Sequence, residues 1–175
     1  EIRVGEAVRL ADARVLIALG GDNSITYSVM QARHVDLPAA GLITLDAHHD
    51  LRDGASNGSP VRRLVEAGLP GTQIVQIGIA DFSNSREYAA RARDLGITVI
   101  TRDALRRRSI GDVMAEALGV AGQGGGDIHV DLDVDVCDRS AVPGCPAAAP
   151  GGLTAHELRQ VALHAGRSPR VSSLD

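Results

Sequence analysis

The sequence predicts an α/β fold with three layers, helix, sheet and helix, around a mainly parallel sheet. Short runs rich in β-branched and apolar residues recur along the chain, and each has the length of a buried strand. Helical patterns lie between these runs, and alternation of strand and helix is typical of parallel sheets. The expected strands are residues 13–20, 40–46, 73–79, 96–101, 127–135 and 170–175.

Three helices are delimited by residues typical of helix ends. The segment 59–68 has a proline near its start and a glycine at its end, and the segment 85–96 also ends on a glycine. The segment 154–166 begins with Thr154 and Glu157, which have the spacing of a capping box. Because helical segments lie between the strands, the strands are expected to run parallel.

Length and composition predict one globular domain over residues 1–175. The chain has 44% hydrophobic residues, which is enough for a sizeable core. Its net charge of −4 argues against binding to nucleic acid or an anionic membrane, so a small-molecule substrate is the expected partner. The start has no signal-peptide pattern, which predicts a cytoplasmic protein. A start without Met and an end on a strand predict a fragment truncated at both ends.

Two acidic clusters follow predicted strands, at the sheet edge where ligands bind in such folds. Residues 46–50 read Asp-Ala-His-His-Asp, and residues 131–135 read Asp-Leu-Asp-Val-Asp. Alternation in an extended chain turns three of the polar side chains in each cluster to one face. Buried carboxylates repel one another unless a cation compensates them. A solvated strand end is the simpler alternative, but a shared metal site explains both clusters.

The donor types indicate which metal such a site would hold. Several carboxylates with one imidazole form an oxygen-rich site, which suits Mn²⁺ or Mg²⁺ better than a metal that prefers thiolate. So many carboxylates favour two ions that share bridging aspartates. A metal lowers the pKa of a water molecule that it binds from about 15.7 towards 7, so the pattern predicts a hydrolase.

Four motifs in order resemble the signatures of the arginase/agmatinase (ureohydrolase) family. They are "GGDNS" (20–24), "DAHHD" (46–50), "DLDVDVCDRSAVPG" (131–144) and "GGLT" (151–154). The resemblance implies the arginase-like three-layer fold, two Mn²⁺ ions, and hydrolysis of a C–N bond in a guanidino or amidino group. It also implies a homo-oligomer, a trimer or a hexamer.

The same resemblance assigns the metal ligands by position in the motifs. Asp46 and Asp133 are expected to bridge the two ions. His48 and Asp135 are expected to bind one ion, and Asp50 the other.

The first motif departs from the family at Asn23, where a histidine usually binds the ion of Asp50. An amide oxygen is a weaker donor to Mn²⁺ than an imidazole, so this ion is expected to be loosely held. Alternatively, Asn23 only caps the following helix beside Ser24.

The loop after the second motif differs from that of arginases and agmatinases. In this loop the chain resembles formimidoylglutamases. Asn57 stands where the family usually has a histidine that shuttles a proton, and Arg52 follows the Asp-Leu pair. A guanidinium near the metals needs a carboxylate partner, so Arg52 is expected to bind an anionic substrate together with Asn57, Ser59 and Ser83. A structural ion pair with Asp53 is the alternative.

The resulting hypothesis is hydrolysis of N-formimidoyl-L-glutamate to L-glutamate and formamide, a step of histidine catabolism. Asp135 and Asn57 are the expected catalytic residues, with Asp135 carrying a proton. Two alternatives stay open: an agmatinase or guanidinobutyrase type of ureohydrolase, and a relative that binds metal without turnover.

Overall fold

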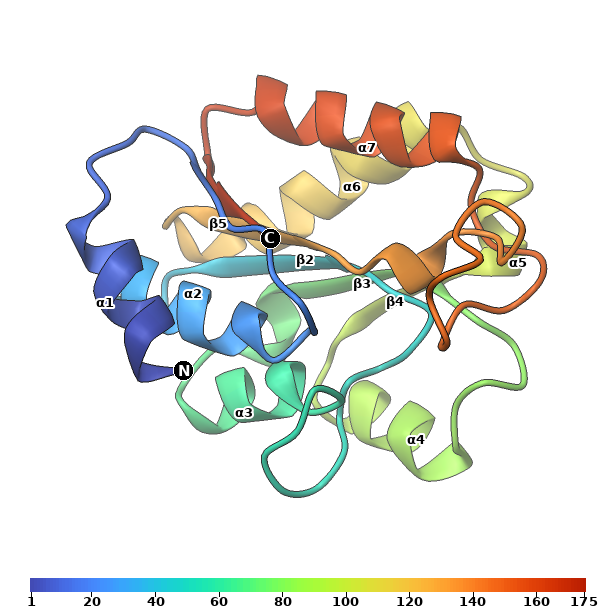
Figure 1. Cartoon of the computed structure of the whole chain (residues 1–175), viewed down its shortest axis with the longest axis horizontal. Helices are drawn as coiled ribbons and strands as arrows, with labels where there is room; N and C mark the ends of the chain where they lie inside the picture. Colours follow the sequence, from blue (N-terminus) through green and yellow to red (C-terminus); the bar gives the residue numbers. More distant parts are fainter.

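The computed structural model describes residues 1–175, and its centre is a six-stranded parallel sheet (Figure 1). The strand order is β1-β6-β5-β2-β3-β4. The bounds are β1 (Leu16–Ile17), β2 (Gly41–Leu45), β3 (Ile74–Ile79), β4 (Thr98–Thr101), β5 (Ile128–Leu132) and β6 (Val171–Leu174).

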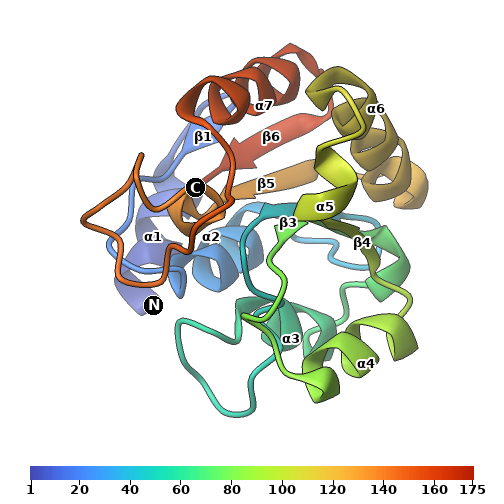
Figure 2. The same cartoon turned by 90° about the vertical axis from the view of Figure 1, so that its right-hand side faces the viewer.

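Helices cover both faces of the sheet, which confirms the predicted three-layer α/β/α fold. Figure 2 shows α6 and α7 on one side of the strands and α3 and α4 on the other. The α-helices are α1 (Ile2–Leu10), α2 (Ile25–Arg33), α3 (Pro60–Glu66), α4 (Arg86–Asp94), α5 (Arg102–Leu105), α6 (Ile110–Ala121) and α7 (Ala155–Arg167). The 3-10 turns are η1 (Gly71–Gln73), η2 (Gly122–Gly124) and η3 (Val134–Val136). None of the helices is long and apolar enough to cross a membrane.

The strands separate most of the apolar side chains into two main cores, because neighbouring residues of a strand point to opposite faces. Ile43 and Leu45 of β2 belong to the core under α6 and α7. Leu42, between them, belongs to the other core with Met30 of α2 and Leu64 of α3. All five residues of β2 are buried, as expected for a central strand of a parallel sheet.

The predicted strand ends differ from the observed ones by more than two residues at two places. β1 has two residues where the sequence predicted eight, and β5 ends at Leu132 rather than at residue 135. The second difference has a local cause: the Asp133 carboxylate accepts a hydrogen bond from the Asp135 amide at 2.8 Å. An aspartate that binds the amide two residues ahead favours a turn over an extended chain. The capping box of Thr154 and Glu157 is confirmed.

The contact between β2 and α6 makes a direct prediction about stability. A Cβ atom on Gly41 would lie 2.0 Å from the carbonyl oxygen of Ala121, so Gly41→Ala must push the helix end from the sheet. We expect a loss of about 1–3 kcal/mol in the free energy of unfolding, measured with urea. Gly119→Ala is the control, because Gly119 lies in the same helix with no atom near the new methyl group. Equal stability of the Gly41→Ala and unaltered proteins would contradict this account.

Candidate metal centre

The two acidic clusters meet where the neighbouring strands β2 and β5 end. Leu45 of β2 pairs in register with Leu132 of β5, so both strands stop at the same level of the sheet. Asp46 follows directly on β2, and Asp133 and Asp135 follow on β5. Parallel pairing in this register therefore brings together residues that are almost 90 positions apart in the sequence.

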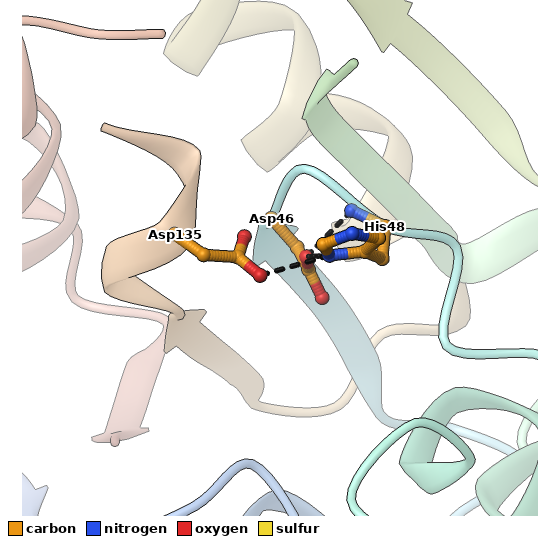
Figure 3. A group of neighbouring side chains, drawn as sticks. All are labelled: Asp46, His48 and Asp135. Atoms are coloured by element: carbon orange, nitrogen blue, oxygen red, sulfur yellow. Dashed lines mark hydrogen bonds and ion pairs between the residues drawn. The ribbon is translucent and has the colours of Figure 1, made fainter. Parts of the chain in front are cut away.

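Asp46, His48 and Asp135 form the centre of the cluster, shown in Figure 3. Each offers a potential ligand atom, and these atoms all lie within 4.8 Å of one another. The His48 Nδ1 atom lies 2.8 Å from Asp135 Oδ2 and 3.4 Å from Asp46 Oδ1. The main chain fixes both carboxylates, because the His48 amide donates to Asp46 at 2.6 Å and the Ala47 amide donates to Asp135 at 2.9 Å.

A cavity of about 730 Å³ opens above this cluster. Its size suits a small-molecule ligand. Asp46 is buried and does not line it. Most of the predicted metal and substrate residues line it: Asn23, His48, Asp50, Arg52, Asn57, Asp133 and Asp135.

Burial dominates the electrostatics of the centre. It raises the pKa of Asp46 well above the usual range, and repulsion by Asp50 and Asp135 acts in the same direction. Burial likewise raises the pKa of Asp50 to about 7 and raises that of Asp133. These groups resist ionisation because burial removes them from water and the neighbouring carboxylates repel their charge.

His48 partly compensates the acids. Its hydrogen bond to Asp135 raises the pKa of His48 to about 10. Burial opposes ionisation of Asp135, but the hydrogen bonds from His48 and from the Ala47 amide lower its pKa overall. Together, these shifts describe a pocket that prefers positive charge.

The residues of the cluster fit a hard divalent cation. They provide carboxylate oxygens and one imidazole, the donors that Mn²⁺ accepts. Asp131 is a further buried acid that a positive charge would stabilise, since it is only 2% exposed and its Oδ2 atom has no hydrogen-bond partner. A cation near these groups would lower the cost of burying them, whereas protons compete with it for Asp50 and His48.

Asp50 and Asn23 meet at one side of the cluster. The Asn23 Nδ2 atom donates to Asp50 Oδ2 at 2.7 Å, and the Thr26 hydroxyl donates to Asn23 Oδ1 at 2.8 Å. Asn23 therefore makes no cap to the main chain of α2, whose N-cap residue is Ser24. Its oxygen, the atom that would bind a metal, faces Thr26 and reaches the cluster only if the amide group turns over. Asp50 has a φ of 50°, a left-handed conformation that is uncommon outside glycine and often found at functional sites.

The loop after Asp50 brings Arg52 and Asn57 to the cavity. The Arg52 side chain lies across Gly58, where an added Cβ atom would come within 2.7 Å of the Arg52 Cδ atom. Asp53 pairs with Arg91 at 2.9 Å, so the structural ion pair of Arg52 with Asp53 does not form. The Arg52 guanidinium is exposed and pairs with no acid.

Two of the predicted substrate residues lie away from the cavity. The Ser59 side chain is fully buried, and its hydroxyl both accepts from the Ser56 amide and donates to the Ser56 carbonyl. This hydroxyl stabilises the loop. Ser83 is exposed and does not line the cavity.

Asn84, which the sequence did not single out as a site residue, binds the main chain of segment 46–50. Its side chain accepts from the His49 amide at 3.1 Å and donates to the Ala47 carbonyl at 2.9 Å. Its place in the polar stretch after β3 was the available signal. His49 is buried and its Nδ1 atom lies 2.7 Å from Gln76 Oε1, as expected for a packing histidine.

Comparison with known proteins identifies relatives of the chain. The sequence profile of the arginase family matches residues 3–175. Formimidoylglutamase of Halalkalibacterium halodurans is 40% identical over 164 residues, which is 91% of this chain and 51% of the relative.

Two solved structures share the fold. The crystal structure of Bacillus subtilis formimidoylglutamase is 33% identical, with a TM-score of 0.89 over 99% of this chain and 57% of that chain. Formiminoglutamase of Trypanosoma cruzi with Mn²⁺ is 25% identical, with a TM-score of 0.89 over 99% of this chain and 61% of that chain. The chain thus spans about half the length of the curated relatives it matches. The family profile matches nearly the whole chain, and a relative is 40% identical over an alignment that covers 91% of it, so the chain belongs to the arginase family.

Proposed function

We propose that the protein hydrolyses N-formimidoyl-L-glutamate to L-glutamate and formamide, with two Mn²⁺ ions. The observation that carries this proposal is the unpaired Arg52 guanidinium in the same cavity as the acidic cluster. The names of the relatives support the choice of substrate, and the Trypanosoma cruzi structure with Mn²⁺ supports the choice of metal. A trimer or hexamer in the cytoplasm is part of the proposal.

The cluster would hold the ions between the two strand ends. Asp46 and Asp133 would bridge them, His48 and Asp135 would bind one ion, and Asp50 would bind the other, with Asn23 as its weak neighbour. When bound, the ions would polarise the amidine carbon and lower the pKa of the attacking water.

Arg52 and Asn57 would hold the far end of the substrate. A guanidinium binds a carboxylate through two parallel hydrogen bonds, and this pairing is strong where water is partly excluded. The substrate is a dicarboxylate, so it complements Arg52, whereas the cationic tail of agmatine would be repelled.

The chain must also move a proton during the reaction. The water oxygen forms a bond to the formimidoyl carbon, and the bond from this carbon to the glutamate nitrogen breaks. One proton of the water goes to that nitrogen and the other to the imino nitrogen, which gives formamide. Asp135 lines the cavity and exchanges a hydrogen bond with His48, so we assign the proton transfer to it. Asn57 has no titratable group, so its contribution is to orient the substrate.

The substrate assignment predicts a selective effect of Arg52→Met. We expect kcat/KM for formimidoylglutamate to fall by roughly two orders of magnitude, because a charge-assisted bidentate pair is lost and each 1.36 kcal/mol is tenfold. Bound Mn²⁺ should be unchanged. Turnover of agmatine, if measurable, should stay equal or rise, since a repelling charge is gone.

Arg93→Met is the matched control, because it removes an exposed positive charge away from this cavity. A preference of the unaltered protein for agmatine or guanidinobutyrate would favour the second type of ureohydrolase. Mn²⁺ binding without turnover of any of these substrates would indicate the non-catalytic relative.

The weak second ion makes a separate prediction at Asn23. An imidazole is a better donor than an amide, so Asn23→His should raise Mn²⁺ occupancy towards two ions per chain in a calorimetric titration. Asn23→Ala, which offers no ligand atom, should not. Two equally tight sites in the unaltered protein would show that Asn23 does not weaken the second ion.

A further inference from the structure

Arg102 is a buried cation that no acid compensates. It begins α5, directly after β4, and its side chain is 7% exposed. Figure 2 shows α5 beside the ends of β3 and β4. The salt bridges of the structure do not include this guanidinium, which is costly to bury unless its N–H groups find acceptors.

Main-chain carbonyls supply these acceptors. The Arg102 Nη2 atom donates to the carbonyl oxygens of Asp135 at 2.9 Å and Val136 at 3.2 Å. Nε donates to the carbonyl of Gly78 on β3 at 3.2 Å. Nη1 makes longer bonds of 3.5 Å to the carbonyls of Ala149 and Pro150, in the loop before α7. One side chain thus joins three segments that are far apart in the sequence.

The turn η3, to which Arg102 makes its shortest hydrogen bond, carries two of the proposed metal ligands. Asp133 is the N-cap residue of η3, and Asp135 lies within this turn. The carboxylate of Asp135 is fixed on one side by His48 and Ala47, and the carbonyl of the same residue is fixed on the other by Arg102. Both ends of this residue are therefore held.

Close packing leaves η3 no alternative position on the side of β3. A Cβ atom on Gly78 would lie 2.3 Å from Val136 Cγ2, and Gly78 has a φ of 94°. Gly78 thus lets the turn approach the sheet, and Arg102 ties the turn to the carbonyl of that same glycine. The arrangement needs a planar fork of donors, which arginine has and lysine lacks.

We infer that Arg102 is a positioning residue of the metal centre, which holds the main chain of η3 so that Asp133 and Asp135 reach the cluster. The inference rests on the metal site of the proposed function. It assigns the role to a side chain that lies outside the family motifs quoted above and that touches neither the cavity nor the ligand atoms.

The test is the affinity of the metal-free chain for Mn²⁺, measured by calorimetry in Arg102→Met and Arg102→Lys. Changes to residues that orient metal ligands typically cost 10- to 100-fold in affinity, and we expect a loss of about this size for Arg102→Met. Arg102→Lys should lose less affinity, because it keeps the positive charge but not the planar set of N–H donors. If Arg102→Met does not fold, the Mn²⁺ affinity of Arg102→Lys tests the inference.

Two controls separate positioning from a general loss of stability or charge. Arg107→Met removes an exposed arginine that pairs with Asp103, and it should bind Mn²⁺ as tightly as the unaltered chain. Val113→Ala removes buried volume in α6, away from the cavity, so it should lower the free energy of unfolding and leave the affinity unchanged.

Each result decides the matter. Unchanged Mn²⁺ affinity in both Arg102 variants overturns the inference and leaves the proposed function intact. An equal loss of affinity in Val113→Ala overturns it too, because stability alone would then explain the effect. If the unaltered chain binds no Mn²⁺, the proposed function and the inference both fail.

Discussion

The rest of the structure depends on the burial of mutually repelling carboxylates where β2 and β5 end. Asp46, Asp131 and Asp135 are all buried, and Asp50 and Asp133 lie close enough to add to the repulsion. In the low dielectric of a protein interior such charges cost several kcal/mol unless protons, donors or a cation compensate them. The raised pKa values of His48, Asp46 and Asp50 reflect this cost.

The fold holds this arrangement through main-chain contacts, not through side-chain pairs alone. The amides of Ala47 and His48 donate to the carboxylates, Asn84 in the stretch after β3 binds the main chain of the same segment, and Arg102 binds the main chain of η3. A carboxylate cannot relax away from its neighbours when its own backbone is fixed. A preformed site of this kind would bind a metal without the entropic cost of ordering the ligands.

Much of the architecture follows from local patterns in the sequence. The strand 41–45, rich in apolar and β-branched residues, and the capping box at Thr154 predict their elements because the determining residues are neighbours. The end of β5 did not follow, since the Asp133 side chain competes for the Asp135 amide and turns the chain. Asp133 and Asp135 nevertheless both line the cavity, but so does Val134 between them, so the turn and not strand alternation places them there. Ser59 was out of reach, because hydroxyl contacts inside a loop depend on its exact path. Arg102 was also out of reach: its carbonyl acceptors lie up to 48 residues away and leave no mark in the sequence.

The most direct test of this account is the free energy of unfolding as a function of free Mn²⁺, measured with urea near pH 8. A cation that relieves the buried carboxylates must stabilise the native state by mass action, by about 2.7 kcal/mol at a concentration 100 times Kd. The account predicts this rise for the unaltered chain and its near-disappearance in Asp133→Ala, which loses one of the proposed metal ligands while the apolar strands keep the fold. A stability that does not depend on Mn²⁺ in the unaltered chain, or a rise that Asp133→Ala retains in full, would contradict it.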